Sequence, residues 1–192
     1  VAVTNAVNLS DGLDGLAGGI SLLTFVCLGY LAYLNDFQPL ETMSVAMIGA
    51  IFGLLRYNTH PAVVFMGDSG SQLLGFFAIT ISLNLTQQCD QLSPFLPLFI
   101  AGLPIIDTLW VFVRRIKLGK SPFTADTIHL HHKLMRLGLF HSESVVSIYL
   151  LHALIDRLVE CQRKPSIPYS FPSLFRTPTF SSRKCESRLN SL

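Results

Sequence analysis

The chain has 192 residues, of which 50% are hydrophobic and only 14% are charged. Its mean hydropathy of +0.49 is typical of a membrane protein and argues against a soluble globular protein. We expect the lipid bilayer as its environment and no nucleic-acid partner.

The predicted fold is all-α, a polytopic membrane helix bundle with about four to five transmembrane helices, since one span needs about 20 mainly apolar residues. Five apolar stretches are the candidates: residues 16–34, 42–56, 73–88, 94–113 and 144–156. The first and fourth meet the length requirement easily, and the second and third are short. The fifth is too short to span, because it breaks at Asp156 and Arg157.

The distribution of basic residues predicts the orientation of the helices. Loops 35–41 and 89–93 have no Lys or Arg. The basic residues before position 157 all lie toward the other end of the predicted bundle: Arg56, Arg114, Arg115, Lys117, Lys120, Lys133 and Arg136. The positive-inside rule places that end in the cytoplasm, together with the polar loops 57–72 and 114–143 and the start of the chain.

Two regions differ in composition. Residues 1–156 hold seven basic and ten acidic residues, whereas residues 157–192 hold seven basic and two acidic ones, with four prolines and many serines. We therefore predict a membrane domain over 1–156 and a basic, Pro/Ser-rich tail over 157–192. The tail is disordered, contacts anionic lipid headgroups, or is out-of-frame sequence.

A first polar cluster precedes the first apolar stretch. It consists of Asn5, Asn8, Asp11 and Asp14, whose spacing of three puts them on one face if the segment is helical. A capped helix start needs fewer oxygen-bearing side chains than these four. Because hard cations take oxygen ligands, the cluster favours a metal and a phosphorylated substrate at the membrane surface.

A second cluster is the segment Phe65-Met66-Gly67-Asp68-Ser69-Gly70-Ser71, which leads into the third apolar stretch. A loop that enters a helix N-terminus supplies free N–H groups to an anion. Asp68 beside such a site would need a cation or a hydrogen-bond network. The alternative is an ordinary capped turn.

A third cluster contains His129, His131 and His132. With Lys120, Lys133 and Arg136, these histidines are predicted to contact phosphates. Transition-metal binding by the histidines and a solvated basic loop are the alternatives. Asp107, near the end of the fourth stretch, is interpreted as a structural hydrogen-bond partner rather than as an ion site.

Taken together, the three motifs resemble those of the polyprenyl-phosphate N-acetylhexosamine-1-phosphate transferases over about residues 1–155. The motifs are Asn-x-x-Asn-x-x-Asp-Gly-x-Asp-Gly-Leu-Ala-Gly-Gly, Phe-Met-Gly-Asp-Ser-Gly-Ser and Ser-Pro-Phe-x-x-Asp-x-x-His-Leu-His-His. The His-Leu-His-His form is more similar to the WecA-type GlcNAc-1-phosphate transferases than to MraY-like phospho-MurNAc-pentapeptide transferases. The resemblance implies transfer of a sugar-1-phosphate from a UDP-sugar to undecaprenyl phosphate at the bacterial inner (plasma) membrane, with release of UMP.

The resemblance also implies roles for single residues. Asp68 would be the principal Mg²⁺ ligand, assisted by Asn8, with Mn²⁺ as the alternative ion. Asp14 would hydrogen-bond the uracil and Phe65 would stack on it. The three histidines would close over the pyrophosphate and sugar as catalytic and substrate-binding groups. Asp11 is assigned to catalysis, and Asn5, Lys120 and Lys133 to substrate binding.

One departure from the family pattern is the absence of any Asp-Asp pair in this sequence. The family carries such a motif upstream, so we expect a fragment that is inactive by itself. Competing interpretations are an MraY-like transferase, a non-catalytic membrane remnant and an ion-coupled transporter, the last disfavoured because the predicted midplane is largely apolar. The sequence also permits a homo-oligomer.

Overall fold

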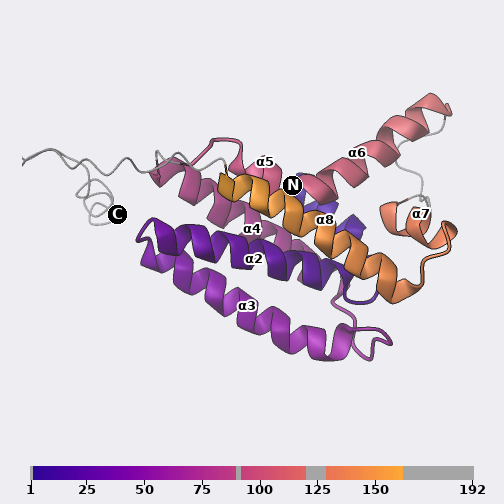
Figure 1. Ribbon diagram of the computed structural model, residues 1–192, viewed down its shortest axis with the longest axis horizontal. Coiled ribbons are helices and arrows are strands. Elements are labelled where there is room, and N and C mark those ends of the chain that lie inside the picture. Colours follow the sequence, from indigo (N-terminus) through magenta and orange to yellow (C-terminus); the bar gives the residue numbers. More distant parts are fainter. Residues whose placement is uncertain (1, 90–91, 120–128, 162–192) are drawn as a thin grey trace, which may run out of the picture.

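The computed structural model describes residues 2–89, 92–119 and 129–161 (Figure 1). All regular elements within these residues are helices, which confirms the predicted all-α class. They are α1 (Ala2–Ser10), α2 (Leu16–Leu34), α3 (Gln38–Asn58), α4 (Gly67–Gln88), α5 (Leu96–Ile100), α6 (Gly102–Lys117), α7 (Leu130–Arg136) and α8 (His141–Cys161). The predicted 162–192 part of the tail and Lys120 lie outside the described residues.

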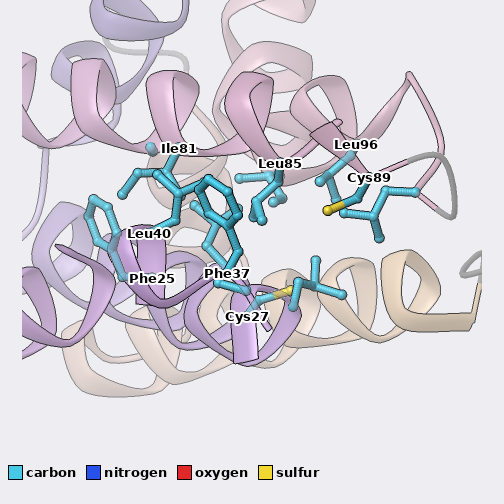
Figure 2. Packing of buried hydrophobic residues seen from close by; sticks show 14 of the residues in the cluster. Phe25, Cys27, Phe37, Leu40, Ile81, Leu85, Cys89 and Leu96 are labelled. Atoms are coloured by element: carbon cyan, nitrogen blue, oxygen red, sulfur yellow. The ribbon is translucent and has the colours of Figure 1, made fainter. Parts of the chain in front are cut away.

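Helix α2 is the centre of the bundle. It packs against α3, α4 and α8, which surround it along its length (Figure 1). The main core is built largely from apolar side chains of α2 and α4, such as Phe25, Ile81 and Leu85 (Figure 2). Phe37, just after α2, and Leu96 of α5 pack into the same core. This packing holds the neighbouring helix ends in fixed positions, and the polar loops extend from those ends.

Among the residues that the structure describes, two helices are long and apolar enough to cross a membrane, α2 and α3, with mean hydropathies of 1.7 and 1.3. Helix α2 is mostly buried, whereas only 17% of the apolar window of α3 is buried. Large apolar side chains on α3, such as Val45 and Phe52, point outward. Such a surface is typical of a helix that faces lipid, so the structure is consistent with a membrane helical protein.

The fourth apolar stretch does not form the continuous helix that its length predicted. Helix α5 ends at Ile100, and α6 begins at Gly102 after a break at Ala101. Proline has no N–H to donate, so Pro104 cannot bond the carbonyl of Ile100 in an unbroken helix. Figure 1 shows α6 leaving the bundle toward α7.

The fifth apolar stretch is longer as a helix than predicted. Helix α8 has 21 residues and continues through Asp156 and Arg157, where a break was expected. Asp156 is buried, and its carboxylate lies 3.7 Å from His152 one turn earlier. Because packing accommodates this polar pair, the charged residues do not end the helix, which also passes the predicted domain boundary at 156.

Candidate functional site

Four segments meet at one end of the bundle, which we call the loop end. They are the α1–α2 loop (residues 11–15), the α3–α4 loop (residues 59–66), α7, and the first turn of α8. Hydrogen bonds or ring contacts connect the α3–α4 loop to the α1–α2 loop and to α8. Because His131 of α7 also lies against Gly12, and Ser71 of α4 bonds Asn8, the loop end brings together the three polar clusters that the sequence keeps far apart.

The first cluster does not lie on one helical face, contrary to the prediction. Helix α1 ends at Ser10, so Asn5 and Asn8 are helical whereas Asp11 and Asp14 lie in the following loop. Gly12 N bonds Ser10 O, which closes a tight turn directly after the helix. Gly15 then adopts a φ of 78°, a left-handed conformation that glycine takes readily, and the chain enters α2.

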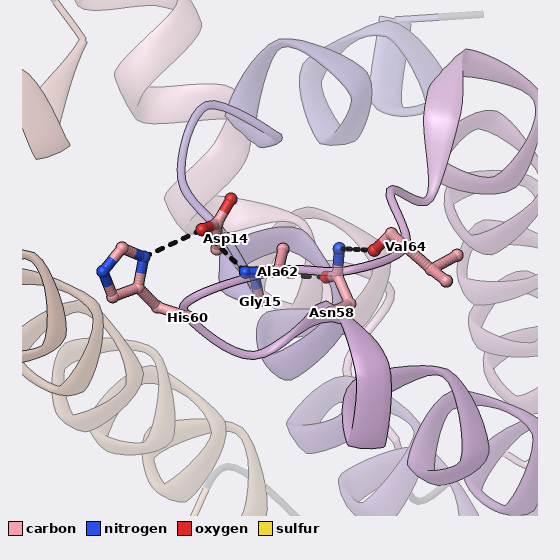
Figure 3. Close-up of polar contacts among 6 residues, drawn as sticks. All are labelled: Asp14, Gly15, Asn58, His60, Ala62 and Val64. Carbon is pink, nitrogen blue, oxygen red and sulfur yellow. Dashed lines mark hydrogen bonds and ion pairs between the residues drawn. The ribbon is translucent and has the colours of Figure 1, made fainter.

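Hydrogen bonds to Asn58 of α3 and Tyr149 of α8 hold the end of the α1–α2 loop. Gly15 N donates to Asn58 Oδ1 at 3.1 Å, and Asn58 Nδ2 donates to Val64 O at 2.8 Å (Figure 3). Tyr149 Oη donates to Gly15 O at 2.6 Å. Asn58 is buried, so its side chain connects the two loops in place of water.

Asp14 is fixed against the α3–α4 loop. Its Oδ2 lies 2.9 Å from His60 Nδ1 and accepts a hydrogen bond from Ala62 N at 3.2 Å (Figure 3). The hydrogen bond from His60 lowers the pKa of Asp14 below its ordinary value, despite some opposing desolvation, and Ala62 N and nearby His141 lower it further. Asp14 is therefore an ionised carboxylate near neutral pH.

Asp11 has a different environment from Asp14. Burial raises its pKa above the ordinary value, and repulsion from Asp68 and then from Asp14 raises it further. Asn8 lies beside the first turn of α4, where Ser71 Oγ donates to Asn8 Oδ1 at 2.6 Å. Asn8 and Asp68 thus lie at the first turn of α4, and Asp11 is near enough to be affected by the charge of Asp68.

This donor set fits a hard divalent cation. The carboxylates supply the oxygen ligands that Mg²⁺ prefers. Burial is the main cause of the raised pKa of Asp11, and the negative charges of Asp68 and Asp14 add to it; a cation near Asp68 and Asn8 would offset this repulsion. Asp68 itself is exposed and accessible to a ligand.

The histidine cluster is held by α6. Asp107 Oδ2 lies 2.9 Å from His129 Nδ1, and Asp107 Oδ1 accepts a hydrogen bond from Leu130 N at 2.8 Å. Asp107 is therefore a hydrogen-bond partner, as predicted, and it caps α7. His131 is buried, and desolvation followed by repulsion from His132 and His129 lowers its pKa to about 4.

The other predicted site residues are either exposed or contact aromatic rings. The Phe65 side chain is exposed, with 72% of its surface accessible, as a stacking platform would be. Lys133 Nζ lies 4.5 Å from the centre of the Trp110 ring, which the sequence did not indicate. Asn5 is exposed, and His132 contacts the ring of His131.

Several residues at the loop end were missed by the sequence analysis: Asn58, His60, His141 and Tyr149. Each is isolated among residues of another kind, and none belongs to a repeated polar pattern. Only the Asn58-to-Pro61 segment, directly before the second cluster, offered a signal that this stretch is a structured turn rather than a simple link.

Comparison with known proteins gives the family. Residues 1–86, which include Asp11, Asp14, His60 and Asp68, match the family model described as glycosyl transferase family 4. This region of the chain belongs to that family. The resemblance deduced from the motifs is thereby confirmed.

Proteins similar to this chain carry related names. A Bacillus subtilis protein named probable undecaprenyl-phosphate N-acetylglucosaminyl 1-phosphate transferase is 42% identical over 153 residues, which is 79% of this chain and 42% of the relative. A decaprenyl-phosphate N-acetylglucosaminephosphotransferase of Mycolicibacterium smegmatis is 39% identical over 78% of this chain and 42% of the relative.

The undecaprenyl-phosphate alpha-N-acetylglucosaminyl 1-phosphate transferase of Escherichia coli K12 is 38% identical, over 80% of this chain and 43% of its own length. The chain thus spans less than half the length of these curated relatives.

Proposed function

We propose that this protein takes part in transferring a sugar-1-phosphate, GlcNAc-1-phosphate, from a UDP-sugar to undecaprenyl phosphate, with release of UMP. This would be the initiating step of cell-envelope polysaccharide synthesis. The observation that carries the proposal is the placement of Asn8 and Asp68 at the first turn of α4, with Asp14 held against the adjoining α3–α4 loop. The names of the relatives agree with this substrate class.

Mg²⁺ is the proposed metal, with Asp68 and Asn8 as its ligands and Mn²⁺ as the alternative. When bound, the ion would offset the negative charge of the phosphate oxygens. Ser71 would hold the carboxamide of Asn8 in place, because their hydrogen bond of 2.6 Å ties α1 to the first turn of α4. The first turn of α4 would thus orient a metal ligand that α1 supplies.

Nucleotide recognition is assigned to the two loops. Asp14 is ionised and fixed by the α3–α4 loop, so it can accept a hydrogen bond from the N3–H of uracil. Phe65 presents an exposed ring in the same loop, on which a base can stack. Asp14 would thus recognise the hydrogen-bonding edge of the uracil ring, and Phe65 would contact the face of the ring.

The histidines are assigned to the diphosphate and sugar. When His129 Nδ1 donates its proton to a hydrogen bond with Asp107, His129 Nε2 stays available to contact the substrate. His131 is neutral near pH 7 because its pKa is about 4, so it donates a hydrogen bond without adding positive charge. Lys120, Lys133 and Asn5 complete the proposed substrate contacts.

The proposed location is the bacterial inner membrane, with the loop end facing the cytoplasm. UDP-sugars are water-soluble and undecaprenyl phosphate is lipid-anchored, so the site must lie where both can reach it. The candidate spans α2 and α3 both have one end at the loop end, which would hold the site at the membrane surface. This arrangement would let the phosphate of the lipid approach from the bilayer side.

Equilibrium binding of UMP to the purified chain in detergent tests the proposal. We expect binding in the presence of Mg²⁺, loss of binding when Mg²⁺ is chelated, and loss in the Asp68→Ala variant. The control is Glu41→Gln, which removes an acidic residue at the start of α3, away from the loop end. Equal UMP affinity with and without Mg²⁺, or in Asp68→Ala, would contradict the metal assignment.

A further inference from the structure

A second group of ligating side chains lies at the loop end, apart from Asp68 and Asn8. Asp14, His60 and His141 each offer one ligand atom, and these atoms all lie within 4.8 Å of one another. The three residues come from the α1–α2 loop, the α3–α4 loop and the first position of α8. Their convergence is a product of the fold, because 46 residues separate His60 from Asp14 and 81 separate it from His141.

The Asp14 carboxylate is already oriented as a metal ligand would be. Ala62 N donates to its Oδ2 at 3.2 Å, and His60 Nδ1 lies 2.9 Å from the same oxygen. Backbone hydrogen bonds of this kind fix the direction of ligating carboxylates in metal sites. A cation that enters here would meet a negative charge held in place.

His141 supplies an independent observation. Its Nδ1 is buried, and in the described residues it has no hydrogen-bond partner. Its ring lies 4.2 Å from that of His60, with a tilt of 32° between the planes. A buried polar atom without a partner is rare in proteins, and here it belongs to a side chain that stands beside two other candidate ligands.

The chemistry of the three ligands points to a different metal from Mg²⁺. Two imidazoles and one carboxylate suit Zn²⁺ and other borderline divalent metals, whereas Mg²⁺ prefers oxygen ligands throughout. Bonds of about 2.0 Å in a tetrahedral site put ligand atoms about 3.3 Å apart, so His60 Nδ1 and Asp14 Oδ2, which lie 2.9 Å apart, would separate slightly if both bind the metal. His60 can provide this movement, because 54% of its side chain is exposed.

We propose that Asp14, His60 and His141 form a binding site for a borderline divalent metal of the Zn²⁺ class, separate from the proposed Mg²⁺ site. The metal would connect the two loops to α8 at the loop end. Its fourth position would remain open to water or an anion. Where the proposed role of Asp14 in uracil recognition holds, Zn²⁺ at this site would draw Asp14 away from the base and weaken UMP binding.

Titration of the full 192-residue chain in detergent with Co²⁺, a spectroscopic probe for Zn²⁺, tests this site. We expect saturation at one equivalent, visible absorption typical of a low-coordinate Co²⁺ ion, displacement by Zn²⁺, and no displacement by Mg²⁺. His60→Ala should weaken Co²⁺ binding by about tenfold or more, as loss of a metal ligand or its support does. Because His60 is largely exposed, this variant should remain folded.

The matched control is His132→Ala, which removes a histidine from the other cluster and should leave Co²⁺ affinity unchanged. Absence of saturable Co²⁺ binding, or loss of binding in His132→Ala but not in His60→Ala, would overturn the proposal. The Co²⁺ titration needs no nucleotide, so it stands apart from the proposed transferase function. If saturating Zn²⁺ leaves UMP affinity unchanged, then the uracil role of Asp14 is wrong while the metal site stands.

Discussion

The imidazole of His131 lies against Gly12, so closely that a Cβ atom added to Gly12 would stand 2.5 Å from His131 Nε2. The contact joins the α1–α2 loop to α7. It depends on the missing side chain of glycine, since any other residue would overlap the ring. The acidic and histidine clusters are therefore held together by direct packing.

Gly12→Ala tests this contact. The new methyl group would displace His131 and with it α7, and we expect a loss of about 1–3 kcal/mol in the free energy of unfolding. Trp110, the one tryptophan of the chain, lies under Lys133 of α7, so its fluorescence should also change. Gly53→Ala is the control, because nothing lies within 4 Å of its added Cβ. Equal stability of the two variants would show that α7 does not rest on the α1–α2 loop.

The pH dependence of stability should report the burial of His131. Its pKa is about 4 in the folded chain and about 6.5 when unfolded, so the unfolded chain binds more protons between these values. Stability should therefore be full above pH 6.5 and fall as the pH drops toward 4, by at most about 3 kcal/mol. Unfolding curves at pH 7.5 and 4.5 measure this, and His131→Gln should show a smaller difference. An unchanged difference in that variant would place the acid sensitivity elsewhere.

Asn58→Ala should be strongly destabilising. The buried carboxamide bonds Gly15 N and Val64 O, and removing it leaves both groups without this partner inside the protein. We expect a loss of roughly 2–4 kcal/mol in the free energy of unfolding. Asn84→Ala is the matched control, since its Nδ2 donates only to Thr80 O within α4. Chemical denaturation of both variants should give a much smaller loss for Asn84→Ala, and similar losses would contradict a linking role for Asn58.

Asp107→Ala should loosen α7. The variant loses the hydrogen bonds to His129 Nδ1 and Leu130 N, which together hold the start of this short helix. We expect amide hydrogen exchange in residues 130–136 to rise about tenfold, which corresponds to about 1.4 kcal/mol. Thr108→Val, which removes only a bond to Pro104 O inside α6, should leave this exchange unchanged. Exchange that is equally slow in Asp107→Ala would exclude Asp107 as the cap of α7.

Metal dependence should separate the two proposed cation sites. Chelation of Mg²⁺ should abolish UMP binding, whereas Zn²⁺ should weaken it in the unmodified chain but not in His60→Ala, because that variant lacks a ligand of the second site. Competition binding with labelled UMP measures both effects. Identical Zn²⁺ inhibition in the two proteins would place the inhibitory metal outside the Asp14, His60 and His141 group.

The sequence by itself determined the fold class, the approximate positions of the helices and the three polar clusters. These are local properties, because an apolar run of sufficient length favours a helix and Gly, Asp and Asn favour its ends. The family resemblance also depends only on residue order, and the family model confirms it. Hydropathy predicted the helix bounds least well over 94–113, because it treats this stretch as one continuous helix. Pro104 interrupts the helical hydrogen bonds there, and the chain forms two helices instead.

Only the tertiary structure decided which polar side chains meet. The end of α1 at Ser10 moved Asp11 and Asp14 off the helical face that a spacing of three predicted. The pairing of Asp14 with His60 and the contact of Gly12 with His131 join residues far apart in the chain. Such contacts depend on how α2, α4 and α8 pack, because a side chain's partners are set by the position of neighbouring helices and not by its own segment.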